Sequence, residues 1–361
     1  MFSEIEEPRR KTKGNYRHEL TDIVLLVISA VISGASEWEE IEMFGRSQQD
    51  WLSQYGSFSN GIPSHDTINR VISSIDPDQF SRCFSSWINE ITSLSKGEVV
   101  AIDGKRLRGS YNNATGAPAI HMVSAFASEN GLCLGQVSTH EKSNEITAIP
   151  ELLDNLTLHG CTVTIDAMGC QTAIAEKIRE KGADYILAVK GNQGALEEGI
   201  KDTVRFNNPI DTSTNVDAGH GRIETRICNV YHLSDHMENI ERWKDLKYII
   251  EIQAERVIKS TGQITKEKRY YITNKGAKAK NFNKDIRSHW SIENNLHWVL
   301  DVTFGEDASR KRQKFAAQNF NTINKIALTL LANENTLKAS KKCKRLAAAV
   351  NPEIRAKILN L

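Results

Sequence analysis

The sequence predicts an α/β protein in which a mixed β-sheet carries helices on its faces, after a helical domain and around a β-rich insertion. Apolar residues recur at helical spacing from about residue 16 to residue 95. From Gly97 the pattern changes to short β-type runs mixed with helical runs, in the order βββαβαβα. Between about residues 207 and 283 alternating strands interrupt this order, and a helical pattern then returns.

The composition is that of a globular protein with an uneven charge distribution. The chain has 361 residues, of which 40% are hydrophobic and 25% charged, enough for more than one core. Its net charge is +1, but residues 310–361 hold 12 Lys or Arg and 2 Asp or Glu, so this segment carries +10 and the first 309 residues carry −9. Such a basic segment indicates a polyanionic partner, and a solvated helical tail is the alternative.

Cysteine usage and hydropathy indicate a cytoplasmic protein. The six cysteines are scattered without a Cys-x-x-Cys pair, which favours reduced thiols over disulfides or a zinc site. The N-terminal segment is charged and polar, unlike a signal peptide. The most apolar run, residues 23–34, is shorter than the about 20 residues that span a bilayer, so we expect a buried helix and no membrane partner.

The first elements are short helices. Residues 1–14 are expected to be a disordered arm, and residues 15–96 a helical domain. Helices are expected from Leu20, through Trp38 and around Trp51, and Ser64 and Asp76 are expected to cap two more. Short helices with tight turns are compatible with a DNA-binding helix-turn-helix variant.

Two aspartates follow buried strands in the predicted sheet. Residues 99–102 form a β-type run that ends at Asp103, and two further runs complete an antiparallel meander. After a helix that contains Pro150, the strand TVTID ends at Asp166. If the first and fourth strands are neighbours, both carboxylates emerge at one edge, where such sheets bind ligands.

A third acid, Glu293, lies in an amphipathic helix expected from Asp285 to about Val302. Tryptophans surround it, where an unpaired charge is costly. Oxygen ligands from distant parts of a chain suit Mg²⁺, and two such ions about 4 Å apart support the hydrolysis and rejoining of phosphodiesters. The structural alternatives are a turn at Asp103, an N-cap at Asp166 and a surface glutamate.

Other chemistries have weaker support. Paired carboxylates also serve glycosidases, but the basic segment and the helical domain do not call for one. His232 with His236, and Glu293 between His289 and His297, have zinc-like spacing without the order of a strong zinc motif. There is no nucleophile-elbow motif, and GNQGALEEG lacks the ending of a phosphate-binding P-loop.

A series of motifs along nearly the whole chain resembles the ISAs-type insertion-sequence transposases, whose members beside Rhs elements are called H-repeat-associated proteins. The motifs are IPSHDT, AIDGKRLRGS, HMVSAFASENGLCLGQV, EKSNEITAIPELL, TIDAMGCQ, YILAVKGNQG, GHGRIETR, RYYI and HWSIENNLHWVLDVTFGEDASR. The resemblance implies a DDE transposase with a ribonuclease-H-like core and a β-rich insertion before the last acid. It assigns catalysis and metal binding to Asp103, Asp166 and Glu293.

One departure from the wider DDE pattern concerns the neighbours of the glutamate. Where related transposases often have Tyr, Arg and Lys, this chain has Ile286, His289 and Leu300, with Arg287 offset. We expect His289 or Arg287 to contact phosphate instead. The acids close enough to be alternative third ligands are Asp301, Glu306 and Asp307, of which Asp307 is the main rival.

The resulting hypothesis is Mg²⁺-dependent cleavage at the ends of a mobile element and strand transfer into target DNA, in a prokaryotic cytoplasm and at the nucleoid when bound to DNA. Asp103 would bridge two Mg²⁺ ions, for which Mn²⁺ can substitute, and Asp166 and Glu293 would each complete one site. The expected DNA contacts are Arg70, Lys105, Arg106, Arg108, Lys190, Arg287, His289, Lys311 and Arg312.

The resemblance implies a homodimer on DNA that binds the element's inverted repeats. The expected segments are an arm (1–14), a helical DNA-binding domain (15–96), a first core part (97–206), the insertion (207–283), the final core helices (284–335) and a basic tail (336–361). A metal nuclease without strand transfer and a catalytically silent DNA-binding remnant remain as alternatives.

Overall fold

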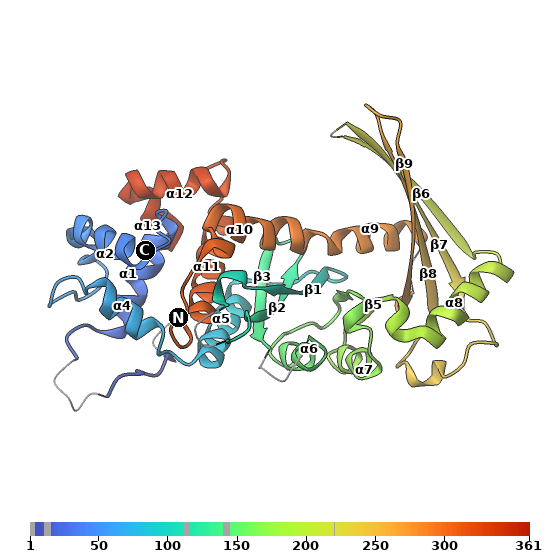
Figure 1. Cartoon of the computed structure of the whole chain (residues 1–361), viewed down its shortest axis with the longest axis horizontal. Coiled ribbons are helices and arrows are strands. Elements are labelled where there is room, and N and C mark those ends of the chain that lie inside the picture. Colours follow the sequence, from blue (N-terminus) through green and yellow to red (C-terminus); the bar gives the residue numbers. More distant parts are fainter. Residues whose placement is uncertain (1–3, 11–15, 112–115, 140–144, 220, 277) are drawn as a thin grey trace.

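The computed structural model describes residues 4–10, 16–111, 116–139, 145–219, 221–276 and 278–361. The N-terminal part is helical, as predicted (Figure 1). Ser64 accepts a hydrogen bond from the Thr67 amide and Asp76 one from the Gln79 amide, so both expected caps are present. The helices are α1 (Leu20–Ile32), α2 (Trp38–Ser47), α3 (Gln49–Leu52), α4 (His65–Ile72) and α5 (Pro77–Ile91).

Helix α1 is the apolar run that the sequence predicted to be buried. Ile23, Leu26 and Ala30 on it are fully buried. Within the described ranges, no helix combines the length and hydropathy needed to cross a membrane. Of the arm predicted for residues 1–14, residues 1–3 and 11–14 lie outside the described residues; in the described part Ile5 is buried, and Glu7 pairs with Arg9 at 2.6 Å.

One mixed sheet runs through the rest of the protein. Its strand order is β3-β2-β1-β4-β5-β9-β8-β7-β6. The pairs β1–β4 and β4–β5 are parallel, whereas β1–β2, β2–β3 and β5–β9 are antiparallel. The strands are β1 (Val99–Arg106), β2 (His121–Ala127), β3 (Leu132–Ser138), β4 (Thr162–Ile165), β5 (Asp184–Val189), β6 (Asp211–Gly219), β7 (Arg222–His232), β8 (Tyr248–Ile258) and β9 (Ile264–Thr273).

Helices cover both faces of the first five strands. In Figure 1, α9 and α10 run along one side of them, and α6 and α7 lie along the other. Helix α9 packs on β1 and β4, and α6 packs on β2 and β3. This arrangement is the ribonuclease-H-like core that was expected. The helices are α6 (Glu145–Asp154), α7 (Thr172–Glu180), α8 (Gly194–Phe206), α9 (Ala279–His289), α10 (Trp298–Phe304) and α11 (Ala316–Asn333).

The β-rich segment of residues 207–283 extends the core sheet. Its last strand, β9, pairs with β5, so that β9, β8, β7 and β6 continue the sheet outward to one end of the molecule (Figure 1). Three of these strands, β7, β8 and β9, match the alternating runs RIETRICNVYHLS, LKYIIEIQAERVIKS and KEKRYYITN, which predict strands. Strand β6 was missed because its residues, DTSTNVDAG, are polar and mostly exposed, so it lacks an apolar face.

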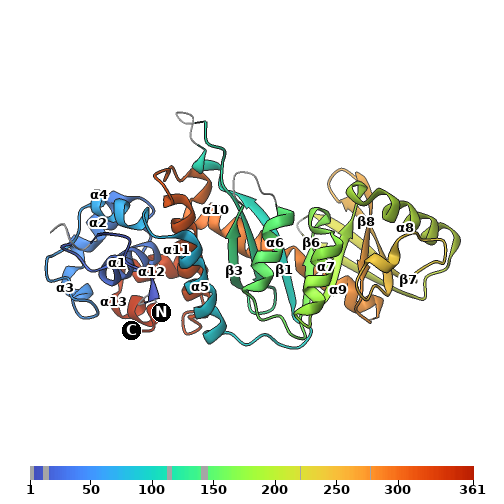
Figure 2. The same cartoon turned by 90° about the horizontal axis from the view of Figure 1, so that it is seen from below.

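The basic C-terminal segment is folded onto the N-terminal helices. Helices α12 (Lys341–Val350) and α13 (Pro352–Leu359) pack against α1 and α11, and both chain ends lie in this region (Figure 2). Arg345 donates to the Val31 carbonyl at 2.8 Å, and the fully buried Arg355 lies over the Trp51 ring at 4.1 Å. The alternative of a solvated tail is therefore wrong for these arginines, because their charges are used in tertiary contacts.

Candidate functional site

Asp103 and Asp166 lie on neighbouring parallel strands, as predicted. Ile102 of β1 is in register with Ile165 of β4, so the next residue on each strand is one of the aspartates. The prediction that Asp103 ends its strand is wrong. Strand β1 continues to Arg106 because its antiparallel pairing with β2 extends beyond the end of β4, and Asp103 is opposite Ser124.

Asp166 also has the capping role that was considered as its alternative. Its Oδ1 accepts hydrogen bonds from the Met168 amide at 3.1 Å and the Gly169 amide at 3.4 Å, which begins the short 3₁₀ turn Ala167–Gly169. A capping carboxylate keeps a second oxygen available. The cap thus fixes the orientation of Asp166 at the edge of the sheet without using up its charge.

Glu293 is placed by an irregular turn of the helix that follows the insertion. Residues Glu293–His297 form a π-helical turn between α9 and α10. Such a turn contains an extra residue and re-aims side chains, and it occurs often at functional sites. Glu293 is 56% exposed, whereas His297 one turn later is 5% exposed and lies under the strand that carries Asp103.

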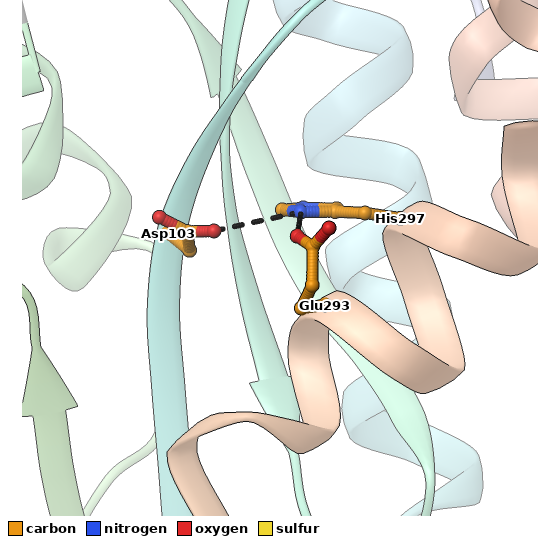
Figure 3. A group of neighbouring side chains, drawn as sticks. All are labelled: Asp103, Glu293 and His297. Carbon is orange, nitrogen blue, oxygen red and sulfur yellow. Dashed lines mark hydrogen bonds and ion pairs between the residues drawn. The ribbon is translucent and has the colours of Figure 1, made fainter. Parts of the chain in front are cut away.

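Three side chains meet across this turn and β1. Nδ1 of His297 lies 3.2 Å from Oε2 of Glu293 and 3.5 Å from Oδ2 of Asp103 (Figure 3). One ligand atom from each residue lies within 4.8 Å of the other two, which is close enough for a shared cation. His297 was named in the sequence only as part of a zinc-like spacing, and its i, i+4 relation to Glu293 was the signal available for this contact.

All three predicted acids line one pocket of about 340 Å³, here called the acidic pocket. Two of the predicted phosphate contacts, Lys190 and His289, line it as well. His289 is further held by a 2.9 Å hydrogen bond between its Nδ1 and Oγ1 of Thr164 on β4. The pocket therefore combines Asp103, Asp166 and Glu293, drawn from three separate elements, with a lysine.

Burial and neighbouring carboxylates raise the pKa values of two acids in the pocket, Asp103 and Asp166. Burial and the nearby Asp166 charge raise the pKa of Asp103 to about 7. Burial, followed by the charge of Glu145, also raises the pKa of Asp166. Burial lowers the pKa of His289 to about 4 and, together with Lys325 and Lys105, that of His297 to about 3. Both imidazoles are thus neutral at pH 7, and a neutral imidazole can coordinate a cation.

This donor set fits a divalent cation. Two carboxylates and a neutral imidazole converge, and the Asp103 carboxyl, whose pKa is raised by burial and by the nearby Asp166 charge, can release its proton to a bound cation. Asp166 lines the same pocket. The residues that would hold the ion are therefore Asp103, Glu293 and His297, with Asp166 alongside.

Two predicted DNA contacts are engaged elsewhere. Nζ of Lys105 contacts Asp301, Glu306 at 2.9 Å and the His297 carbonyl at 3.5 Å, so its three donors are taken. Lys311 is buried beneath Trp38 and Phe320, where it donates to the Ser36 carbonyl and to Glu37. Both ammonium groups are thus engaged in contacts within the protein, and their contact with DNA stays a prediction.

The remaining predicted residues lie outside the acidic pocket. Arg108 pairs with Asp307 at 3.6 Å, and Asp307, the rival third acid, does not line the pocket. Arg287 pairs with Asp217 at 2.5 Å and lines a neighbouring groove. Three other predicted contacts are exposed, namely Arg70, Arg106 and Arg312, and Arg312 donates to the Gly109 carbonyl.

A further pair near the acids was not found from the sequence. Nε2 of His121 on β2 lies 2.7 Å from Oε1 of Glu145 at the start of α6. A Cβ on Gly104, directly after Asp103, would lie 2.2 Å from that same carboxylate oxygen, so the glycine makes room for the pair. The pair comes from elements 24 residues apart, and no motif marks it.

A ribonuclease-H-like sheet with three convergent acids defines a class of polynucleotide-processing proteins, and the comparisons with known proteins agree. Residues 94–330 match the family described as Transposase DDE domain, and residues 1–88 match its associated domain, DDE_Tnp_1-associated. This chain belongs to the DDE transposase family, as its motifs implied.

Similar proteins carry corresponding names. The chain is 47% identical to "Putative transposase YncI" of Escherichia coli O157:H7, covering 95% of this chain and 90% of that protein. It is 44% identical to "H repeat-associated putative transposase YhhI" of Escherichia coli K12, covering 95% and 92%. A solved piggyBac transposase synaptic complex with hairpin DNA matches with a TM-score of 0.45 at 11% identity, covering 98% of this chain and 75% of that one.

Proposed function

We propose that this protein cuts DNA at the ends of an insertion element and joins the freed 3′ ends to target DNA, in a reaction that depends on a divalent metal. The observation that carries the proposal is that Asp103, Asp166 and Glu293, which lie up to 190 residues apart, line one pocket. Membership of the DDE transposase family supports the same reaction class.

The acids would act as metal ligands. Mg²⁺ is the proposed ion and Mn²⁺ its substitute, because the donors are mainly carboxylate oxygens. When bound, such ions activate the attacking hydroxyl and stabilise the leaving 3′ oxygen. His297 would add its neutral imidazole as a further ligand, since its Nδ1 lies 3.2 Å from Glu293 and 3.5 Å from Asp103.

Other groups of the pocket would bind the substrate. Nζ of Lys190 offers a positive charge for a phosphate of the cleaved strand, and no ion pair occupies it among the described residues. His289 would stay neutral and, tied to Thr164, would give the wall next to the scissile phosphate a fixed shape.

The other segments would hold DNA and a second copy. We propose the helical domain, residues 15–96, as the part that reads or holds the inverted repeats, with the exposed Arg70 on α4 near the phosphates. A homodimer would bring two element ends together. Residues 97–206 and 284–335 would form the catalytic core around the insertion at 207–283.

The test uses purified full-length protein, Mg²⁺ and an end-labelled DNA fragment that contains both flanks of its own gene. We expect nicks at the repeat ends, followed by joined products. Asp166→Ala should lower the cleavage rate by more than about 100-fold, which is the upper range for groups that merely orient a metal ligand. The control is Asp202→Asn, because Asp202 is exposed on α8, away from the pocket.

The outcomes separate the alternatives. Cleavage without joined products would favour a metal nuclease. Salt-sensitive binding without any cleavage by the wild type would favour the silent DNA-binding protein. Cleavage that survives Asp166→Ala while it still requires Mg²⁺ would mean that the acids are assigned incorrectly.

A further inference from the structure

A second concave surface adjoins the acidic pocket. It is a groove of about 560 Å³ between the insertion strands β7, β8, β9 and the helix α9. It shares Arg269, Tyr271, Ile286 and Trp290 with the acidic pocket, so the two surfaces are continuous. We call it the arginine groove, because it is lined by Arg222, Arg226, Arg256, Arg269 and Arg287.

The alternation of side chains along the insertion strands forms one wall of the groove. In the β7 sequence RIETR, every second residue faces the groove, namely Arg222, Glu224 and Arg226. The groove-facing residues of β8 are Ile252, Ala254 and Arg256, and those of β9 are Glu267, Arg269 and Tyr271. One face of the insertion sheet thus presents rows of charged side chains beside an apolar floor.

The charge of the groove is positive and partly unbalanced. The lining residues include five arginines and two glutamates, a formal charge of +3, and one of these arginines, Arg287, pairs with Asp217 outside the lining. Arg226 and Arg269 are paired with Glu224 and Glu267 at 2.6 and 2.7 Å. Arg222 and Arg256 are exposed, and no ion pair ties either guanidinium to a carboxylate in the part of the chain that the structure describes.

One arginine is positioned where the two surfaces meet. The guanidinium of Arg269 lies 5.2 Å from the centre of the Trp290 ring, and Glu267 holds its other side. Trp290 itself is 44% exposed and belongs to both surfaces. The positive charge of this fixed guanidinium, two donors of which are held by Glu267, suits a phosphate that lies beside the acidic pocket.

We propose that the arginine groove binds the phosphate backbone of the DNA that leaves the acidic pocket. The inference rests on the proposed function, since it takes the pocket as the place of cleavage. Arg222 and Arg256 would contact phosphates along the groove, and Arg269 would contact a phosphate where the groove meets the acidic pocket.

The first test measures binding without catalysis. Anisotropy of a fluorescein-labelled 30-base-pair duplex is titrated with full-length protein in EDTA over a series of NaCl concentrations. Each phosphate contact contributes about 0.9 to the slope of log K against log [NaCl], so Arg256→Gln should lower that slope by about 0.9 and the affinity by about 8-fold at 0.1 M NaCl. Arg222→Gln together with Arg256→Gln should double the change in slope.

The matched control lies on the opposite face of the same strands. Thr265 of β9 is opposite Arg256, and Lys266 is the next residue along β9. Lys266 pairs with Glu255 at 2.9 Å and does not line the groove. Lys266→Gln should leave slope and affinity within 2-fold of the wild type. Equal losses for the control, or an unchanged slope for the double variant, would overturn the proposal.

A second readout separates this proposal from the catalytic one. In the cleavage assay, Arg256→Gln should raise the DNA concentration for half-maximal rate and leave the rate at saturating DNA unchanged. A lower rate at saturating DNA with unchanged half-saturation would overturn a binding role. If the wild type does not cleave, the salt slopes in EDTA still decide whether the groove binds DNA.

Discussion

Replacement of Lys105 by methionine should destabilise the protein through a buried charge network. The Lys105 side chain is 12% exposed, and Glu306, which it contacts at 2.9 Å, is 5% exposed. Lys105 also contacts Asp301, which is 29% exposed, and Glu306 accepts a further hydrogen bond from Asn321. Methionine keeps the apolar stem but leaves two carboxylates without their cation.

The size of the effect follows from this burial. Removal of one partner of a buried ion pair costs about 3 to 5 kcal/mol, and we expect the lower value, about 3 kcal/mol, because Asp301 can reach water. Addition of Glu306→Gln to the Lys105→Met variant should recover about half of the lost free energy of unfolding, since it removes the more buried of the two carboxylates that lack a cation. The loss should also loosen the π-helical turn, because Lys105 donates to the His297 carbonyl.

The assay is urea unfolding followed by circular dichroism, with Arg106→Met as the control. Arg106 is the next residue on β1 and is exposed, so its replacement should change the free energy of unfolding by less than about 0.5 kcal/mol.

The pH dependence adds a check. Burial lowers the pKa of Lys105, but the attraction of Glu306 and the hydrogen bond to Asp301 outweigh it, and the pKa is raised. A raised lysine pKa contributes stability that is fully present below the unfolded value of about 10.5 and is lost at higher pH. The deficit of Lys105→Met should therefore be constant between pH 7 and 9. A variant as stable as the control would refute the network.

Three further predictions concern the acidic pocket. Glu293→Gln should lower Mg²⁺-dependent cleavage by more than about 100-fold, whereas Asp307→Asn should leave it within a few-fold; the reverse result in the cleavage assay would make Asp307 the third acid. His297→Ala should weaken Mn²⁺ binding, measured by calorimetry, by about 10- to 100-fold, and an unchanged affinity would remove His297 from the site. Because the pKa of Asp103 is raised to about 7, protons compete with the cation below that pH: Mn²⁺ affinity should rise with pH up to about 7 and then level off, and a flat profile from pH 5.5 to 8.5 would contradict this.

The two aspartates could be located from sequence because the rules that place them are local and topological. Apolar runs mark β1 and β4, and the crossover helices between parallel strands bring their carboxyl ends together. Glu293 could be assigned to a helix, but the π-helical turn that aims it toward Asp103 has no apolar period of its own. The contact of His297 with both acids depends on that turn, so it could not be predicted from the sequence.

The roles of the basic residues were the least predictable. Lys105 and Lys311 differ little in sequence context from exposed lysines, yet their partners lie 196 and 275 residues away in the chain. Only the tertiary fold decides whether an ammonium is free. The arginine groove was not predicted either, because its five arginines lie on three strands and one helix that only the tertiary fold brings together.

The pairing of β9 with β5 explains why an insertion can serve the site without containing any of its acids. Strand β4 carries Asp166 at its end, β5 follows it in the sheet, and β9 comes next. Asn274 fixes this joint, since its side chain accepts from the Tyr185 amide at 2.7 Å and donates to Asp184 at 2.6 Å. Because the strands are hydrogen-bonded as one sheet, the arginine rows of β7 to β9 keep a fixed distance from the acids. A segment attached only through loops would have to order itself on each DNA molecule and lose conformational entropy in doing so, whereas the continuous sheet has already met that cost on folding.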